Sequence, residues 1–363
     1  MSASAPEPTV AVIIPNWNGA HHLVDCLQSL ASQLRPGVRV VVVDNGSTDT
    51  SLALLASRFP WVEVIALADN LGFSAAVNAG IRSTDSEFVV LLNNDTKAAP
   101  DWLERLVDGM RRHPRASFAA CKMLLFDPPH RIDSAGDRYS LLSGAGINIG
   151  AGEPAAARSE AAWVFGACAG AAIYRRSLFE DIGLFDEDFF LVFEDVDLDL
   201  RAQVAGHRCI YLPDAVVYHK RGASTDNSSR IVEVRAWRNL IWVAGKNLPP
   251  LLLAWWMLLF WLKFAQLVVV AVVVRGLRKL RPGKQAQQQP ARESQPLSSS
   301  IPANSWRQGA LAGHYLPALR QAFAKLPAKR RALRSIRRLG SLRLLPILVR
   351  PIQPLDPAKP SDR

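Results

Sequence analysis

Residues 10–45 read VAVIIPNWNGAHHLVDCLQSLASQLRPGVRVVVVDN. Two runs of apolar, mostly β-branched residues, at 10–15 and 38–43, have the length and composition of strands. Leucines recur between them at helical spacing: Leu23, Leu27, Leu30 and Leu34. Strands that are apolar along their whole length are typical of parallel sheets covered by helices on both faces. The stretch therefore predicts a strand–helix–strand unit of a parallel sheet.

The same alternation continues along the chain. It predicts helices near 50–58 and 72–82, and strands at 62–67 and 87–92. Together these elements predict an α/β fold with a Rossmann-like, open, mostly parallel sheet. In such sheets the ligand crevice lies at the carboxyl ends of the strands.

Polar residues follow three of the predicted strands. They are Pro15-Asn16-Trp17-Asn18, Asp44-Asn45-Gly46-Ser47 and Asn93-Asn94-Asp95. Each group alone is explained by ordinary turn chemistry, in which Asn, Asp, Gly and Ser are common. Three such groups at one edge of a sheet are better explained by a shared ligand.

An acidic segment at 186–199 reads DEDFFLVFEDVDLD, and a histidine, His219, follows 24 residues after Asp195. Carboxylates beside bulky apolar groups feel desolvation and mutual repulsion, which prepare one of them to accept a proton. The alternative is the start of a helix, where acidic residues complement the helix dipole. The segment is thus a candidate for acid–base chemistry.

Charge is unevenly distributed over the 363 residues, whose formal net charge is +11. From Arg275 to the end there are 19 Lys and Arg but 3 Asp and Glu, a net charge of +16, which leaves −5 for residues 1–274. The tail therefore calls for an acidic partner, either an anionic membrane or nucleic acid. Nucleic acid is not expected as a partner, because the tail has no aromatic platform on which bases could stack.

The four cysteines have no metal-type spacing and predict buried, reduced thiols. The first residues, MSASAPEPT, lack the basic and apolar regions of a secretory signal, so none is expected.

Residues 251–274 form an apolar run broken by Lys263 and Gln266, with three tryptophans in its first half. The run is long enough to cross a bilayer. Both flanks are cationic and Lys263 stands near the middle, so we expect a shallow or re-entrant membrane segment instead of a full crossing.

Residues 283–305 are rich in Gln, Ser and Pro and predict a linker. Residues 306–350 regain helical spacing. One side would carry Tyr315, Leu316, Leu319, Phe323 and Leu326, and basic residues surround it: Arg320, Lys325, Lys329 and Arg330. Such a helix suits the surface of an anionic leaflet. The alternative is a charged helix that packs on its own domain.

Seven segments resemble, in order and spacing, the family 2 inverting glycosyltransferases, and most closely the bacterial rhamnosyltransferase-like branch. They are VAVIIPNWNG (10–19), VVVDNGSTD (41–49), NLGFSAAVNAG (70–80), LLNNDT (91–96), FGACAGAAIYRR (165–176), FDEDFFLVFEDVDLDLR (185–201) and AGHRCIYLPDAVVYHKRGAS (205–224). The resemblance covers about residues 9–245.

The resemblance implies a GT-A fold for residues 1–245, with a nucleotide-sugar half at about 9–98 and an acceptor half at about 99–245. A membrane-associated segment (246–282), the linker, the basic helical tail (306–350) and a disordered end (351–363) would follow.

The resemblance also implies which residues hold a nucleotide sugar. Pro15 and Asn16 would line the nucleoside pocket, and Asp44 would accept a hydrogen bond from the pyrimidine imide. The other residues implied at the donor are Asn18, Asn70, Gly72, Asn78, Asn93 and Asn94. Asp44 has an alternative role in an Asx-turn or helix cap over Ser47-Thr48, and Gly72 could be a helix-start glycine.

LLNNDT is similar to the DXD-type motif, which holds a divalent metal on the diphosphate. Its first position here is Asn93 instead of Asp, so one carboxylate is missing. Asp95 remains as the implied metal ligand, with Asn94 near the ribose or the sugar. His219 matches a position that supplies an imidazole ligand in related enzymes. The metal would be Mg²⁺, which prefers oxygen ligands, or Mn²⁺, which also accepts imidazole.

The acidic pair of the family falls on Glu194 and Asp195, so the resemblance implies Asp195 as the general base, with Glu194 as its neighbour. Three residues are candidates on the acceptor side: Trp163, Gly166 and Asp197. Trp163 could stack on a sugar ring, and core packing is its alternative. Asp197 could instead pair with Arg201 one helical turn later.

The resulting hypothesis is a metal-dependent inverting glycosyltransferase on the cytoplasmic face of a bacterial inner membrane. It would move a sugar, first of all rhamnose from dTDP-rhamnose, to a hydroxyl of a lipid-linked or cell-surface glycan. The alternative is a membrane-tethered nucleotide-sugar-binding scaffold with little activity, which the missing DXD carboxylate favours. The Glu194–Asp195 pair argues against it, because a scaffold needs no general base.

Overall fold

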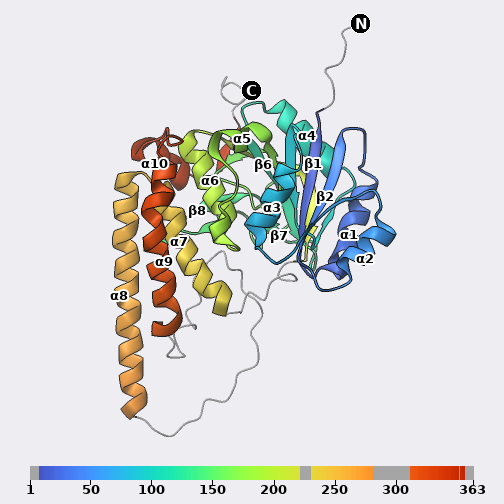
Figure 1. Cartoon of the computed structure of the whole chain (residues 1–363). Coiled ribbons are helices and arrows are strands. Elements are labelled where there is room, and N and C mark those ends of the chain that lie inside the picture. The colour runs from blue at the N-terminus through green and yellow to red at the C-terminus, as the bar shows by residue number, and fades with distance from the viewer. Residues whose placement is uncertain (1–7, 221–229, 281–310, 351, 356–363) are drawn as a thin grey trace.

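The computed structural model describes residues 8–220, 230–280, 311–350 and 352–355 (Figure 1). The acidic segment 186–199, His219 and the strands predicted from the sequence all lie within these ranges. The predicted linker at 283–305 lies outside them.

The first part of the chain forms the predicted parallel unit, and its four strands lie side by side in the order β3-β2-β1-β4. The strands are β1 (Val10–Asn16), β2 (Val38–Asn45), β3 (Glu63–Leu67) and β4 (Phe88–Leu92). The connecting helices are α1 (Ala20–Ala31), α2 (Ser51–Arg58) and α3 (Phe73–Arg82). Leu34 is an exception to the prediction, because α1 ends at Ala31 and leaves this leucine on an exposed turn.

The second part of the sheet is mixed, so the prediction of a mostly parallel sheet holds only as far as β4. Strand β11 (Ala171–Arg175) runs antiparallel to both β4 and β6 (Phe118–Leu125), whereas β6 and β12 (Cys209–His219) are parallel. Short strands complete the sheet: β5 (Thr96–Ala98), β7 (Ile132–Ser134), β10 (Ala162–Val164) and β13 (Ile352–Pro354). A separate hairpin joins β8 (Asp137–Tyr139) and β9 (Gly146–Asn148).

Helices cover both faces of the sheet, and each face has its own apolar core. Helices α1, α2 and α4 (Trp102–Arg112) contribute to one core. Helices α3, α5 (Arg176–Ile182) and α6 (Glu194–Ala205) contribute to the other. The apolar strands 10–15 and 38–43 face both cores, which is why they lack the alternation of a half-buried strand.

Strand register decides which polar residues meet. Asn16 lies opposite Asp44 in the β1–β2 pair. His219, at the end of β12, lies opposite Thr96, the residue after Asp95, in the β12–β5 pair. The sheet therefore brings strand ends from distant parts of the sequence to one edge.

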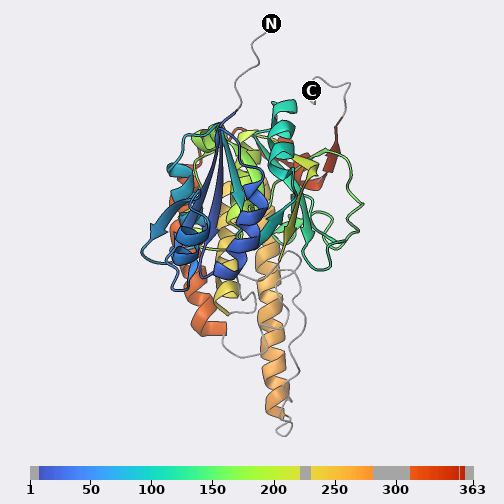
Figure 2. The ribbon, with the colours of Figure 1, turned by 90° about the vertical axis from the view of Figure 1, so that its right-hand side faces the viewer.

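Four helices follow the sheet: α7 (Arg230–Asn247), α8 (Pro250–Leu280), α9 (Leu311–Ala332) and α10 (Ser341–Val349). They share a third apolar core with α6 and the start of the acidic segment, built around Phe189, Trp242 and Trp256. Helix α8 projects well beyond the other elements in both views (Figures 1 and 2). No helix in the described ranges is long and apolar enough to cross a membrane.

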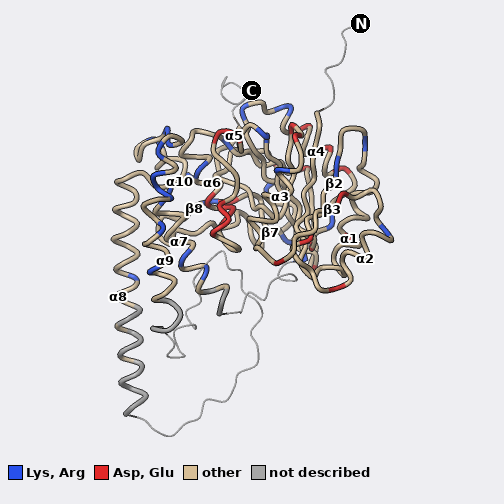
Figure 3. Tube along the Cα trace, viewed as in Figure 1, with Lys and Arg blue, Asp and Glu red and all other residues tan. Residues whose placement is uncertain are grey.

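Helix α9 packs on its own domain, which corrects the prediction that its basic face lies free for a membrane. Lys325 contacts Asp188 at 2.6 Å, and Lys329 contacts Asp186 and Asp188 at 2.7 Å. Figure 3 marks basic and acidic positions along the chain trace in blue and red. Leu319 lies in the third core and Leu326 packs against it, whereas Leu316 is exposed. A helix with an apolar and a basic side can pack either on an anionic membrane or on an acidic face of its own domain. The sequence pattern alone therefore did not distinguish these two alternatives.

The prediction of a disordered end over 351–363 is wrong for Ile352–Pro354. This segment forms β13, which pairs antiparallel with β10 and places Gln353 opposite Trp163. The exposed edge of β10 offers unpaired backbone groups, which the added strand satisfies.

The four cysteines are free, and three of them are buried, in agreement with the prediction of reduced thiols.

Candidate active site

Three strand-end residues form one hydrogen-bonded network at the edge of the sheet. Asn16 donates from Nδ2 to Asp44 Oδ1 at 3.0 Å, and Asn94 donates from Nδ2 to Asn16 Oδ1 at 2.7 Å. All three side chains are buried. A Cβ at Gly19 would collide with the Asn94 amide, so glycine is required beside the network. The structure thus brings these three predicted donor residues together, and their contact with a nucleotide stays a prediction.

The loops after β1 and β2 are tied to each other. Asp44 Oδ2 accepts from the Ser47 amide at 3.1 Å, which is the alternative Asx-turn role, and its other oxygen faces Asn16. Asn18, which has a φ of 50°, accepts the Thr48 amide at 2.7 Å through Oδ1. Pro15 lies in β1 opposite Val43, one residue before the network. These contacts preorganise the loops at the edge where a ligand would bind.

Asn70 and Gly72 form the entry to α3. Asn70 Oδ1 accepts from the Gly72 amide at 3.0 Å and from Asn45 Nδ2 at 3.1 Å. Gly72 caps α3 with a φ of 89°, and a Cβ there would lie 2.5 Å from the carbonyl of Phe190. The helix-start role therefore explains this glycine, and close approach to Phe190 adds a second reason.

Asn78 uses both ends of its amide in a tie between α3 and the acidic segment. Its Nδ2 donates to the Phe185 carbonyl at 2.8 Å and to Glu187 at 2.9 Å, and its Oδ1 accepts from the Phe185 amide at 3.1 Å. The sequence assigned Asn78 to the nucleotide. The structure corrects this, because the tie occupies the whole amide and leaves it a structural role.

His219 lies between two carboxylates, at the end of β12. Its Nε2 is 3.4 Å from Asp95 Oδ1, and its Nδ1 is 2.6 Å from Asp133 Oδ2. Burial acts to lower the pKa of His219, but the hydrogen bonds with Asp133 and Asp95 outweigh it and raise this pKa to about 10. The structure therefore brings together the two predicted metal ligands.

Asp133 was missed by the sequence analysis. It stands 86 residues before His219 in β7, in the unremarkable sequence RIDS, and only the pairing of β7 with β6 brings it to the site. A carboxylate on the far nitrogen of a histidine orients the ring and strengthens it as a metal ligand.

Asn93 keeps a backbone role. Its amide donates to the Gly170 carbonyl at 2.8 Å, and its carbonyl accepts from Thr96 Oγ1 at 2.6 Å. These bonds fix the turn that carries Asn94 and Asp95. Contact of the Asn93 side chain with a donor stays a prediction.

Glu194 and Asp195 start helix α6. Asp195 Oδ1 accepts from the Val196 amide at 2.8 Å, and Oδ2 faces the Ala169 amide at 3.4 Å. Burial raises the pKa of Asp195 while these backbone donors oppose the shift. Burial, and then the charge of Asp195, raise the pKa of Glu194 to about 8. Burial therefore raises the pKa of both carboxyl groups, and that of Glu194 reaches the neutral range.

The residues before this pair are strained. Phe190, Val192 and Phe193 have φ angles of 65°, 75° and 68°. Positive φ is costly for residues with a side chain, about 1–3 kcal/mol each, and is rarest for β-branched valine. Strain of this kind persists where surrounding contacts enforce it, and it often accompanies functional groups.

Two buried carboxylic acids connect the base with the histidine site. Burial, then the charges of Asp195 and Asp133, raise the pKa of Asp137 well above its ordinary value. The pKa of Asp199 is likewise raised well above its ordinary value, first by burial and then by the charges of Asp137 and Asp195. The charges of both Asp195 and Asp133 act on Asp137, so Asp195 and the His219 site lie near the same buried carboxyl group.

The three acceptor-side predictions find structural roles instead. Trp163 is 5% exposed and packs under the guanidinium of Arg208 at 3.6 Å, so the core alternative applies. A Cβ at Gly166 would collide with the Asp199 carboxylate. Trp163 therefore has the core role, whereas contact of Gly166 with an acceptor stays a prediction.

Asp197 is fully buried and bonds Lys246 at 2.8 Å, Asn247 at 2.7 Å and Arg201 at 3.3 Å. The predicted partner Arg201 is confirmed. A carboxylate held by two cations and an amide anchors α6 to α7, and the assignment of Asp197 to the acceptor is wrong.

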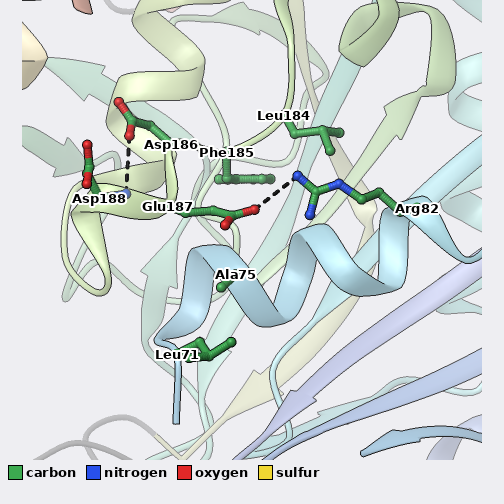
Figure 4. Close-up of a pocket in the computed structure, with 8 residues that line it drawn as sticks. All are labelled: Leu71, Ala75, Arg82, Leu184, Phe185, Asp186, Glu187 and Asp188. Atoms are coloured by element: carbon green, nitrogen blue, oxygen red, sulfur yellow. Dashed lines mark hydrogen bonds and ion pairs between the residues drawn. The ribbon is translucent and has the colours of Figure 1, made fainter. Parts of the chain in front are cut away.

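A shallow depression lies between α3 and the acidic segment (Figure 4). Arg82 and Glu187 form an ion pair of 3.0 Å across it. The depression is lined by Leu71, Ala75, Arg82, Leu184, Phe185, Asp186, Glu187 and Asp188. None of these eight residues was predicted as a site residue. The residues predicted to bind the nucleotide lie mainly at the ends of β1, β2 and β4, and their contact with a nucleotide stays a prediction.

The donor set at His219 fits a divalent cation. It offers one carboxylate oxygen from Asp95 and one imidazole nitrogen, a mixture that suits Mn²⁺. Among the described residues, no group of three or more His, Cys, Asp and Glu side chains is arranged to hold a metal by itself. Two protein ligands are nevertheless common where substrate phosphates complete the shell of the ion.

Comparison with known proteins agrees with this geometry. The model of the family described as "Glycosyl transferase family 2" matches residues 11–183. The N-acetylglucosaminyl-diphospho-decaprenol L-rhamnosyltransferase of Mycobacterium tuberculosis is 32% identical over 245 residues, which cover 60% of this chain and 77% of the relative. An N-acetylglucosaminyltransferase of Bradyrhizobium diazoefficiens is 30% identical over 68% of this chain and 56% of its own length.

Two solved structures share the fold. The mannosyltransferase PcManGT from Pyrobaculum calidifontis, in complex with GDP-Man and Mn²⁺, has a TM-score of 0.50 and 18% identity, over 95% of this chain and 87% of its own. GalNAc-T7 with UDP, GalNAc and Mn²⁺ has a TM-score of 0.54 and 15% identity, over 66% of this chain and 48% of its own. At these identities the likeness concerns the fold alone. The chain therefore belongs to glycosyl transferase family 2, and is an inverting glycosyltransferase with a GT-A-like α/β fold.

Proposed function

We propose that the enzyme moves a sugar from a nucleoside diphosphate donor to a hydroxyl of a lipid-linked or cell-surface glycan, with divalent-metal dependence. Rhamnose from dTDP-rhamnose is the first candidate. The name of the relative from Mycobacterium tuberculosis supports this choice, since it specifies an L-rhamnosyl group and an N-acetylglucosaminyl-diphospho-decaprenol acceptor. One observation supports the proposal above all: His219 contacts both Asp95 and Asp133. The charges of Asp133 and Asp195 both act on the buried Asp137, which relates this site to Asp195.

The donor half of this proposal rests on the buried network of Asn16, Asp44 and Asn94. Asp44 would accept the imide hydrogen of a pyrimidine, and the amides would orient the ribose and sugar. Asp95 and His219 would hold a divalent ion at the diphosphate, with Asp133 orienting the imidazole. When bound, that ion neutralises charge on the departing nucleoside diphosphate.

Asp195 takes the proton from the acceptor hydroxyl as its oxygen attacks the anomeric carbon. The bond from that carbon to the diphosphate oxygen breaks in the same displacement, so the configuration inverts. The raised pKa of Asp195 makes it a stronger base than an exposed aspartate, and the surrounding apolar residues limit competing water.

The donor and the activity can be tested together by a screen of nucleotide sugars with purified protein and Mg²⁺ or Mn²⁺. Release of nucleoside diphosphate that depends on the metal and on one donor is the expected result. Binding of a donor without release or transfer would instead favour the alternative, a membrane-tethered scaffold.

Replacement of Glu194 by Gln should retain more than about a tenth of the wild-type turnover at pH 7, because the glutamine mimics the protonated state that Glu194 already holds. We expect the acid limb of the pH–rate profile to report Asp195, because Glu194, with its pKa raised to about 8, stays protonated below pH 7. The limb should therefore not move in Glu194→Gln. A shift of this limb by a full pH unit would contradict the assignment of the proton to Glu194.

We also propose that α8 attaches the enzyme to the cytoplasmic face of the bacterial inner membrane, as a peripheral or re-entrant element. Leu251, Trp255, Leu258 and Leu262 recur along one side of α8 and are 71%, 50%, 53% and 58% exposed. The opposite side packs into the third core through Trp256 and Phe260. The basic residues from Arg275 onward that are not paired with Asp186 or Asp188 would complement anionic lipids.

Serine at both Leu258 and Leu262 should weaken binding to vesicles of phosphatidylcholine with about 30% phosphatidylglycerol, by about tenfold or more. Each substitution removes apolar contact with the lipid. Leu258 and Leu262 are more than half exposed, so we expect the fold to tolerate their replacement. The matched control places serine at Leu52 and Val64, which are similarly exposed on the sheet domain. Sedimentation with vesicles measures both proteins, and equal binding of the two would contradict attachment through α8.

A further inference from the structure

We propose that Asn239 of α7 is a positioning residue of the transfer reaction, which holds the loop of residues 189–193 so that Asp195 faces the acceptor. We call this segment the Phe-rich loop. The inference rests on the proposed role of Asp195 and adds a residue, far along the chain, that acts through it.

The side chain of Asn239 is fully buried and aims at the backbone of the Phe-rich loop. Its Nδ2 donates to the carbonyls of Phe189, Leu191 and Val192, at 3.1, 3.0 and 2.8 Å. Two amide hydrogens are thus shared among three carbonyls within four residues. Such a chelate fixes the direction of each peptide plane, and a single apolar contact could not do so.

The loop needs an external constraint because its backbone is strained. Phe190, Val192 and Phe193 all have positive φ. Asn239 holds the carbonyls of Leu191 and Val192, which lie among these residues, and without those bonds the loop would relax toward the ordinary regions of φ and ψ. The bonds from Asn239 lie at the positions where that relaxation would begin.

Relaxation of the loop would reach the base directly. The Phe193 carbonyl accepts the first helical hydrogen bond of α6, from the Asp197 amide at 3.0 Å. Asp195 lies two residues after Phe193, and its carboxylate is aligned by the amides at the start of α6. A rotation of the Val192–Phe193 peptide therefore turns the helix start that carries Asp195.

Neighbouring contacts show that the loop is held from two sides. Arg238 donates to the carbonyls of Asp188 and Phe189 at 2.9 and 3.1 Å, and to Asn239 Oδ1 at 3.0 Å. On the other side, the Phe190 carbonyl accepts from the Phe73 amide at 2.6 Å, at the start of α3. The Phe-rich loop thus lies between α3 and the C-terminal helices, and Asn239 holds it at Phe189, Leu191 and Val192.

The test compares Asn239→Leu with Gln203→Met. Gln203 is also a buried amide, and it donates to the Phe165 carbonyl at 2.6 Å, two turns after Asp195 in α6. Both substitutions remove a buried amide of similar size and should lower the melting temperature alike. Only Asn239→Leu should reduce kcat per folded molecule, by about 30-fold or more, since a small misplacement of a catalytic group is costly.

Three readouts separate positioning from folding. In Asn239→Leu the affinity for dTDP or UDP with Mn²⁺ should stay within about threefold of wild type, because only a transition-state interaction is lost. The acid limb of its pH–rate profile should move, because the surroundings of Asp195 change. Hydrogen exchange should accelerate at the amides of 190–196 in this variant and stay unchanged in Gln203→Met.

Equal loss of turnover in the two variants, or unchanged exchange in Asn239→Leu, would overturn the inference. The exchange measurement needs no turnover, so it decides the positioning of the loop even if no donor is accepted and the proposed function fails. Should Asn239→Leu not fold, Arg238→Gln removes the second brace from a partly exposed position. Arg238→Gln should lose less kcat than Asn239→Leu and should show the same faster hydrogen exchange at residues 190–196. Unchanged exchange in Arg238→Gln would equally overturn the inference.

Discussion

Asp195→Asn should lose glycosyl transfer by about 10³-fold or more while it still binds the nucleoside diphosphate, because removal of a general base costs about 10²–10⁴ in rate and this base also aligns the acceptor. The asparagine keeps the shape of the side chain and can still accept from the Val196 amide, as Asp195 does at 2.8 Å. It cannot take the proton of the acceptor hydroxyl.

The same substitution should leave the protein at least as stable as wild type at pH 7–8. Burial raises the pKa values of Asp195 and Glu194 in the folded protein, the latter to about 8. The folded state therefore binds these protons more tightly than the unfolded chain, and stability falls as the pH rises toward 8. Asparagine at 195 removes one buried charge, and with it a cause of the shift at Glu194.

The measurements are steady-state transfer, binding of dTDP or UDP with Mn²⁺, and thermal unfolding at pH 5 and pH 8. Asp101→Asn is the matched control, because Asp101 forms an exposed pair with Arg105 outside the site. Transfer by Asp195→Asn within about tenfold of wild type would remove Asp195 as the base. A large loss of thermal stability would show instead that its charge is stabilising.

Strand positions could be predicted from the sequence because both faces of the parallel strands are buried. A β-branched run such as 38–43, broken only by Arg39 and bounded by turn residues, favours a buried parallel strand, and polar residues at its end then lie near those of its neighbours. For this reason Asn16, Asp44 and Asn94 were predicted at one site and are found together. The mixed half of the sheet was not predicted, since the pairing of its strands, including the long β6 and β12, depends on contacts between distant parts of the sequence.

The contacts that the sequence did not reveal are of three kinds. Asp133 reaches His219 only through strand pairing, and a single aspartate in a short strand has no recognisable pattern. Trp163 and Asp197 stood in suggestive segments, but burial in the final packing decided their roles. Helix α9 showed the amphipathic pattern of a membrane-surface helix, yet its lysines bond Asp186 and Asp188 instead.

The acidic segment was correctly predicted to contain carboxylates with shifted pKa values. Which of these pKa values are lowered and which are raised depends on tertiary contacts. Asp186 and Asp188 are neutralised by lysines from α7 and α9, whereas Glu194 and Asp195 face no such cation in the contacts that the structure describes. Charge alone could not distinguish them along the sequence. The cations arrive from helices that lie more than fifty residues away.

Asp95→Asn should abolish the response of donor binding and turnover to Mn²⁺, with a fall in metal-supported turnover of about 10²–10³-fold, because the site loses the only carboxylate that pairs with His219 Nε2 among the described residues. His219→Asn should do the same by removing the imidazole. Asp133→Asn should have a smaller effect, about 10–100-fold, because it orients the ring through Nδ1 and does not itself contact the ion. This order of effects separates a ligand from a residue that positions one.

The control for this series is His207→Asn. His207 has an equivalent setting elsewhere, with Nε2 2.7 Å from Asp181 and Nδ1 2.8 Å from Ser117 Oγ. Calorimetric titration of dTDP or UDP binding at increasing Mn²⁺, together with turnover, should show a wild-type metal response in His207→Asn and none in Asp95→Asn. The contrary result, an undiminished response in Asp95→Asn and His219→Asn, would mean that the ion binds elsewhere. The imidazole held between Asp95 and Asp133 would then serve as a fixed positive charge for the diphosphate, since its raised pKa of about 10 keeps it protonated.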